Sequence, residues 1–278
     1  MTKKAMYKLV GIFACVYVAF CLTVYYKPQL FFYNPSMQKS VLPEHSGFPA
    51  QEVYYKAEDG TPLYAWYVKP REGKPVVVFL HGNSYNIEGF YHKLIPLVKE
   101  GYGVFLPEYR GFGGIEGKIT QPGLEMDTRA ALKKLRRLGY SNRRIVLYGM
   151  SLGSYTATYA AAEAGKKQPF AGLILEVPFD SLINVVRKRV WFPLPLDLII
   201  RDKYENQKNI AAVKTPLLVM GAGKDRVVPV ELAQNLFAEA AEPKELIIYE
   251  HGSHSNLFDS ENYKDILVWL ENNEKTRQ

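Results

Sequence analysis

Ser151 stands between two glycines in the segment GMSLG, which covers residues 149–153. An apolar run of β-forming residues precedes this segment, and an alanine-rich run that favours helix follows it. A sharp turn from strand to helix crowds the residues beside the serine, and glycine on both sides removes the side chains that would clash. The serine hydroxyl would then be exposed at the positive end of a helix, where it could act as a nucleophile.

A serine hydroxyl is a weak nucleophile unless a base takes its proton and a third group orients that base. Asp225 and His254 follow Ser151 along the chain, each in a polar loop after an apolar run. A carboxylate, an imidazole and a hydroxyl in contact would form a set capable of attacking a carbonyl carbon. The fold must therefore bring three distant segments to one place.

The elements that could do this alternate between β-type and helical runs from about residue 51 onward. This alternation predicts an α/β fold with a mostly parallel sheet and helices on both faces. The predicted strands are unbroken apolar runs, as expected for strands buried on both faces. Residues 52–57 and 63–68, separated by Asp59 and Gly60, predict a β-hairpin. In such a sheet the chemistry lies at the C-terminal ends of the strands, where the sequence places His81, Arg110, Ser151, Asp225 and His254.

The pattern resembles the α/β-hydrolases, and in particular their small membrane-anchored, α/β-hydrolase domain-containing serine hydrolases. The resemblance covers about residues 50–270 and rests on five segments in family order: HGN (81–83), YRGFGGIEG (109–117), GMSLG (149–153), GAGKDRVVP (221–229) and GSHSN (252–256). It implies that Ser151 is the nucleophile, His254 the general base and Asp225 the residue that orients the base. It also implies an oxyanion hole formed by the backbone N–H groups of Asn83 and Leu152.

The chemistry of the residues supports each role, but other candidates stay open. His254 would take the proton of Ser151 and pass it to the leaving group, although His251 is a neighbouring competitor. Asp180 follows an earlier strand and is a second candidate for the acid. Asp225 could instead be only a turn residue or a helix cap, and Ser151 only a closely packed helix start.

The reaction that follows is hydrolysis of a carboxylic ester, an acyl-lipid ester or a thioester through an acyl-enzyme, with lysophospholipase-like activity as one form. A serine aminopeptidase or amidase with the same triad is one alternative. A membrane-anchored interaction protein that has lost catalysis is another. This chemistry needs no cofactor, and the sequence carries no metal-ligand cluster, nicotinamide fingerprint or Walker motif.

Residues 178–213 are rich in bulky apolar side chains and lie between two predicted strands. They predict either a small lid over the site or one ordinary helix packed on the core. A lid of this composition would suit an acyl chain, so the expected substrate is a small or lipid-like ester.

The N-terminus differs from the body, because residues 9–26 contain no charged side chain. As a helix they would be about 27 Å long, close to the thickness of the hydrocarbon core. We therefore predict an uncleaved membrane anchor over residues 1–27, a proline-containing linker over 28–50, and an α/β-hydrolase domain over 51–278. A cleaved signal peptide and a buried core helix are the alternatives.

The charges that flank the anchor predict its orientation. Lys3, Lys4 and Lys8 precede the apolar run, and Lys27 follows it. By the positive-inside rule the N-terminus would be cytoplasmic and the catalytic domain extracytoplasmic.

The overall balance of charges and cysteines excludes some classes of protein. Both cysteines, Cys15 and Cys21, lie in the apolar run, so the body cannot be a disulfide scaffold. The formal charge of +7 comes with several basic clusters, which form either a solvated face or a surface for anionic head groups. No nucleic-acid-binding signature accompanies them, so we expect a membrane and a small substrate as partners, and no nucleic acid.

Overall fold

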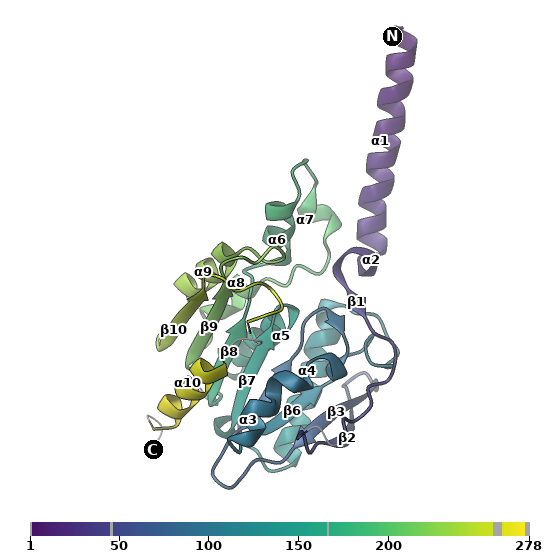
Figure 1. Cartoon of the computed structure of the whole chain (residues 1–278). Coiled ribbons are helices and arrows are strands. Elements are labelled where there is room, and N and C mark those ends of the chain that lie inside the picture. Colours follow the sequence, from purple (N-terminus) through teal and green to yellow (C-terminus); the bar gives the residue numbers. More distant parts are fainter. Residues whose placement is uncertain (1, 45–46, 166, 258–262, 276–278) are drawn as a thin grey trace.

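A computed structural model describes all residues except 1, 45–46, 166, 258–262 and 276–278. Among the described residues, the centre is an eight-stranded sheet in the order β10-β9-β8-β7-β4-β6-β3-β2 (Figure 1). The strands are β2 (Gln51–Lys56), β3 (Pro62–Val68), β4 (Val76–Leu80), β6 (Gly103–Pro107), β7 (Ile145–Met150), β8 (Gly172–Glu176), β9 (Leu217–Ala222) and β10 (Lys244–Tyr249). A separate small sheet pairs β1 (Asn34–Pro35) with β5 (Ser84–Tyr85).

Most neighbouring strands of the large sheet are parallel. The parallel pairs run from β10 through β9, β8, β7 and β4 to β6, whereas β3 pairs antiparallel with both β6 and β2. The predicted hairpin is confirmed, because Gln51 pairs with Tyr67 and Lys56 with Pro62. The predicted α/β class with a mostly parallel sheet is confirmed as well.

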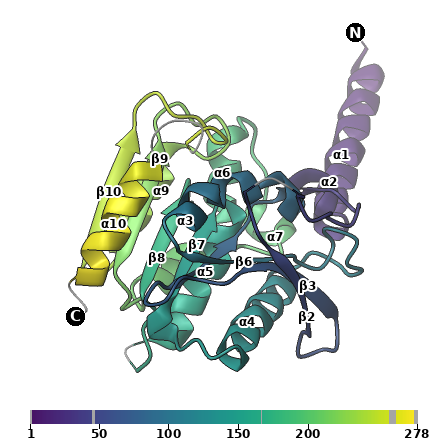
Figure 2. The same cartoon turned by 60° about the horizontal axis from the view of Figure 1, so that its bottom comes forward.

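Helices cover both faces of the sheet (Figure 2). Val78 and Leu80 of β4 face one layer, and Val77 and Phe79 of the same strand face the other, as the two-residue period of a strand requires. The first layer contains α4 (Gln121–Arg137), α5 (Leu152–Ala164), α8 (Asn206–Ile210) and α9 (Val230–Glu239). The second contains α3 (Ile95–Lys99), α10 (Tyr263–Lys275) and the 3-10 turns η1 (Ile87–Gly89) and η2 (Tyr91–Leu94). A third 3-10 turn, η3 (Asn142–Arg144), leads into β7.

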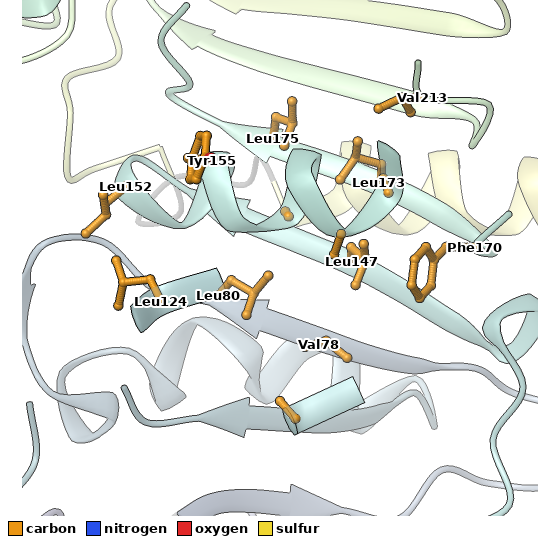
Figure 3. Close-up of a cluster of buried hydrophobic side chains, with 14 of the residues drawn as sticks. Val78, Leu80, Leu124, Leu147, Leu152, Tyr155, Phe170, Leu173, Leu175 and Val213 are labelled. Atoms are coloured by element: carbon orange, nitrogen blue, oxygen red, sulfur yellow. The ribbon is translucent and has the colours of Figure 1, made fainter. Parts of the chain in front are cut away.

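The core around α5 fixes the helix that follows Ser151. Leu80, Leu147 and Leu173, from three neighbouring strands, gather around α5 and are fully buried (Figure 3). Leu152 and Tyr155 of the helix belong to the same cluster. Full burial of such side chains contributes about 1.5–3 kcal/mol each, so the start of α5 is firmly placed on the sheet.

The N-terminal helix α1 (Lys3–Tyr26) projects away from the sheet (Figure 1). It has 24 residues, hence a length of about 36 Å, and is long and apolar enough to cross a membrane. Of its residues only Cys21 and Val24 are buried. The predicted apolar helix is therefore present, and its exposed apolar surface is what a membrane span requires.

The two segments predicted as a linker and as a lid both pack on the body. After α1, the chain forms α2 (Gln29–Phe32) and β1, and further along Ser40 and Phe48 are buried. Residues 178–213 form α6 (Leu182–Arg189), α7 (Leu196–Ile199) and α8 in place of one ordinary helix. Both figures show α7 beside the C-terminal half of α1 (Figures 1 and 2), and the two helices are in contact.

Candidate active site

Ser151 lies at a strained turn between β7 and α5. Its φ of 51° and ψ of −115° are rarely adopted by residues with a side chain. A Cβ atom on Gly149 would lie 2.4 Å from the carbonyl oxygen of Gly153, and one on Gly153 would lie 1.8 Å from that of Leu80. Both positions therefore require glycine for steric reasons, and the turn places Ser151 at the edge of the sheet where the strands end.

We expect Gly153→Ala to lower the free energy of unfolding by about 3 kcal/mol or more. The added methyl group would overlap the backbone of β4, which has no rotamer to change. Gly11→Ala is the matched control, because a Cβ atom there has no neighbour within 4 Å. Thermal unfolding of the detergent-solubilised chain measures the effect, and equal midpoints for the two variants would contradict it.

His254 lies between Ser151 and Asp225. Its Nδ1 is 2.7 Å from Asp225 Oδ2, and its Nε2 is 3.1 Å from Ser151 Oγ. With the proton on Nδ1, the ring donates to the carboxylate and accepts a hydrogen bond from the hydroxyl. The Asp225 side chain is 1% exposed and that of His254 is 17% exposed, so the carboxylate is shielded while the imidazole stays accessible. The structure thus brings the three predicted residues together.

Asp225 also stabilises a turn, which was the structural role considered as the alternative to catalysis. Its Oδ1 accepts hydrogen bonds from the N–H groups of Val227 at 2.7 Å and Val228 at 2.8 Å. The two oxygens divide the roles, because Oδ2 is the one that faces His254. Asp180, the other candidate acid, bonds to the hydroxyl of the next residue, which is 3.4 Å from its Oδ1. Of the two carboxylates, Asp225 is the one beside the imidazole.

The two backbone N–H groups predicted for an oxyanion hole lie near the serine. Leu152 follows Ser151 and begins α5. The loop after β4 comes close as well, since a Cβ atom on Gly82 would lie 3.6 Å from that of Ser151. Within the described part of the chain, no hydrogen bond uses the N–H of Asn83 or of Leu152. Both N–H groups are therefore unpaired donors in the described part of the chain.

The segment that follows α1 holds Asn83 in place. The Asn83 side chain donates from Nδ2 to the carbonyl oxygen of Phe32 at 2.7 Å. Its own carbonyl oxygen accepts from the N–H of Asn34 at 2.9 Å. The candidate oxyanion residue is thus bonded on two sides to the chain that emerges from the apolar helix.

His81 and Glu108, at the same edge of the sheet, hold the loop after β4 in place. The loop that carries Asn83 is braced by Glu108, whose Oε1 is 3.0 Å from His81 Nε2 and whose Oε2 accepts from the N–H of Ile87 at 3.0 Å. Glu108 and His81 are completely buried. Neither faces the imidazole of the candidate triad, so they shape the loop.

Arg110, which follows β6, connects two elements. Its guanidinium is 2.7 Å from Asp127 of α4 and 2.6 Å from Asp59 in the hairpin turn. The hydrogen bond to Asp127 raises the pKa of Arg110, so the side chain stays charged. Arg110 therefore ties the hairpin to α4.

A buried cluster around Glu176 supports the backbone of Ser151. The N–H of Ser151 donates to the carbonyl oxygen of Glu176 at 2.9 Å. The Glu176 carboxylate contacts Lys93 Nζ at 3.1 Å and accepts from the Tyr148 hydroxyl at 2.6 Å. Burial, and then the charge of Glu176, raises the pKa of Tyr148 well above its usual value, which keeps the phenol a donor. Through these contacts the cluster braces the backbone at Ser151.

A cavity of about 410 Å³ extends from Ser151. Its polar end contains Asn83, Ser151 and Leu152, the serine and the two candidate oxyanion residues. Its other walls come from α6, α7, α2, the last turns of α1 and loop residues such as Phe179 and Val228. Apart from Arg189 and the tyrosines Tyr33 and Tyr204, these walls are apolar. Among the described lining residues the charged side chain is Arg189, and no carboxylate is present.

Sequence reasoning missed two kinds of residue here. Phe20 and Val24 of α1 line the cavity, although an apolar run gives no sign of a long-range contact. Glu176 and Lys93 form the buried cluster that supports the backbone of Ser151. The one sign of this cluster in the sequence is a carboxylate, Glu176, at the end of an otherwise apolar strand.

Comparison with known protein families gives two matches. Residues 75–212 match the model described as the alpha/beta hydrolase fold. Residues 199–261 match the model described as serine aminopeptidase, S33. The first match contains Ser151 and the second contains both Asp225 and His254.

The relatives of the chain include three examples that each cover most of it. The uncharacterized protein Rv2307c of Mycobacterium tuberculosis is 34% identical over 78% of this chain and 75% of its own length. The alpha/beta hydrolase domain-containing protein WAV2 of Arabidopsis thaliana is 30% identical over 81% and 77%. The uncharacterized membrane protein YNL320W of Saccharomyces cerevisiae is 28% identical over 81% and 80%.

Solved structures share the fold. The Pyrococcus furiosus esterase Pf2001 superposes with a TM-score of 0.66 at 22% identity, covering 87% of this chain and 97% of the esterase. The Pyrococcus horikoshii acylaminoacyl peptidase superposes with a TM-score of 0.65 at 18% identity, covering 81% of this chain and 41% of the peptidase. At these identities the likeness concerns the fold.

Proposed function

We propose a function that follows from one premise: the chain belongs to the α/β-hydrolase family. In this proposal the chain cleaves carboxylic esters. Ser151 is the nucleophile, His254 is the general base, and Asp225 orients the base. The observation that carries this proposal is the chain of contacts from Asp225 Oδ2 through the imidazole to Ser151 Oγ, at 2.7 and 3.1 Å.

The first half of the reaction forms an acyl-enzyme. Ser151 Oγ attacks the ester carbonyl carbon while His254 Nε2 takes the hydroxyl proton. The negative charge that develops on the carbonyl oxygen is stabilised by the N–H groups of Asn83 and Leu152, at about 3 kcal/mol for each donor. The carbon–oxygen bond to the alcohol then breaks, and the alcohol leaves with the proton from His254.

The second half releases the acid. A water molecule gives its proton to His254 Nε2 and attacks the acyl carbon, and the same two N–H groups stabilise the second oxyanion. The bond to Ser151 Oγ breaks, and the oxygen recovers its proton from the imidazole. The products are a carboxylic acid and an alcohol, and the enzyme returns to its starting state.

The serine aminopeptidase is the second candidate, because residues 199–261 match that family model. An aminopeptidase must bind the ammonium group of its substrate, which a carboxylate does best. The described lining of the cavity offers Arg189 and no carboxylate. A cationic side chain among apolar ones favours an acyl group over a free N-terminus.

For the location of the enzyme, we infer that residues 1–27, which include α1, are a membrane anchor with the cytoplasmic N-terminus that the lysines predict. The length and apolar surface of α1 support an anchor, and one relative is named as a membrane protein. Residues 28–50 then connect the anchor to a hydrolase domain over 51–278 on the extracytoplasmic side.

The test compares two chromogenic substrates on the detergent-solubilised full chain. We expect kcat/KM for p-nitrophenyl butyrate to exceed that for alanine p-nitroanilide by about 100-fold or more. The Ser151→Ala variant is the control for hydrolysis by the solvent. Faster cleavage of the amide, which carries a free amine, would support the aminopeptidase and contradict an esterase.

A further inference from the structure

We propose that the cavity takes the acyl chain of an ester dissolved in the bilayer, and that α1 is a wall of the substrate site as well as an anchor. The inference rests on the proposed ester hydrolysis and names its substrate class. It is carried by the position of α1 relative to the segment between β8 and β9.

The end of α1 packs against this segment over its last three turns. Cys21 and Val24 are buried in a cluster with Ile183 of α6 and with Leu196 and Ile199 of α7. This apolar contact fixes one side of the cavity, because Val24 also lines it. The described part of α1 that precedes the contact is largely exposed.

Two further contacts extend along α1 toward the middle of the helix. The hydroxyl of Tyr17 donates to the carbonyl oxygen of Pro193 at 3.0 Å. The ring of Phe20 lies 6.4 Å from that of Phe192, measured between centroids. Tyr17 is nine residues before Tyr26, which corresponds to about 14 Å along the helix axis. If α1 spans the bilayer, residues 191–193 therefore lie inside its hydrocarbon layer.

The side chains of this tip suit that position. Trp191 is 92% exposed and Leu198 is 75% exposed, values that are unfavourable in water for such large apolar groups. Asp197, the acidic side chain between them, is 3.4 Å from Lys203 Nζ, so its charge is compensated. We name residues 190–198 the lid tip.

Basic side chains lie where the lid tip meets the body. Arg187, Lys188 and Arg189 end α6 just before the tip. The guanidinium of Arg201 lies 5.3 Å from the ring centroid of Tyr25, in the last turn of α1. Cationic side chains beside an interfacial tyrosine are typical of a surface that binds anionic lipid head groups. The head-group layer would therefore lie at the level of the end of α1, with the lid tip on its hydrocarbon side.

A groove on the lid tip adjoins the cavity that contains the serine. This groove of about 500 Å³ is lined mainly by apolar side chains, Trp191 and Leu198 among them, and also by Arg187 and Asp197. It shares Val190, Leu194 and Leu196 with the cavity that reaches Ser151. Phe20 and Val24 of α1 line the same cavity, so an acyl chain in the hydrocarbon layer would reach the catalytic centre between α1 and the lid tip.

The experiment compares two esters with one leaving group on the full chain reconstituted in phosphatidylcholine vesicles. The soluble ester is 4-methylumbelliferyl acetate, and the bilayer-dissolved ester is 4-methylumbelliferyl palmitate. Val24→Trp fills the cavity from the α1 side, and Val18→Trp, at an exposed position of the same helix, is the matched control.

We expect Val24→Trp to lower palmitate hydrolysis by about tenfold or more, while acetate hydrolysis changes by less than about threefold. Val18→Trp is expected to change neither rate. Leu194→Trp, at a side chain that lines both the groove and the cavity, is expected to give the same selective loss and is the deciding variant if Val24→Trp does not fold.

Three results would overturn this inference while the proposed esterase function stands. They are a wild-type chain that cleaves the acetate but not the palmitate, equal losses on both esters in Val24→Trp, and no change on either ester in that folded variant. A wild-type chain that cleaves neither ester would remove the proposed function, and the acyl-chain site with it.

Discussion

Replacing Ser151 by alanine is expected to lower kcat for ester hydrolysis by about 10⁵-fold or more, to a rate close to that of the binding site without a nucleophile. The serine is the one group that bonds covalently to the acyl carbon in the proposed reaction. The substitution removes a single oxygen atom at a residue that is 7% exposed. The fold should survive, because the backbone contact of Ser151 with Glu176 does not involve the side chain.

The measurement is steady-state turnover of p-nitrophenyl butyrate by the folded variant. Ser141→Ala is the control, because this serine is exposed and its side chain caps no helix. The control should retain the wild-type rate. A Ser151→Ala variant with more than about a tenth of the wild-type kcat would show that another group performs the attack.

Asp225→Asn is expected to lower kcat by about 10⁴-fold with little loss of stability. An amide oxygen could still accept the N–H groups of Val227 and Val228, so the turn is preserved. The amide NH₂ would then face His254 Nδ1, which must become an acceptor. The ring proton moves to Nε2, and the imidazole can no longer accept the proton of Ser151.

Asp180→Asn is the matched control, because it makes the same chemical change at the other candidate acid. Its hydrogen bond to the adjacent serine hydroxyl does not reach the imidazole, so we expect kcat to fall less than about tenfold. Turnover and thermal midpoints of both variants should be measured together. A larger loss of turnover in Asp180→Asn than in Asp225→Asn would reverse the assignment of the acid.

The local geometry around Ser151 was predictable because its physical cause is local. Two glycines beside a serine, between a β-type run and a helical run, specify a sharp turn whatever the distant chain does. The positions of Asp225 and His254 were predictable for a different reason. In a parallel sheet the C-terminal strand ends share one edge, so residues after β9 and β10 lie near the residue after β7.

The walls of the cavity were not predictable, because they depend on how α1 packs against a segment about 170 residues away. Phe20 and Val24 have the composition of any membrane span, and nothing in their spacing indicates a contact with α7. The role of Glu108 was hidden for a similar reason. Its partners, His81 and Ile87, belong to another strand end and become neighbours only after the sheet has formed.

The most direct test of the central claim, that Ser151 is an activated nucleophile, is peptide mapping by mass spectrometry after treatment with a fluorophosphonate. Wild-type chain is predicted to carry one phosphonyl group, on Ser151, and the His254→Ala variant to carry almost none. A folded wild-type chain with no adduct, or with its adduct on a different residue, would contradict the claim.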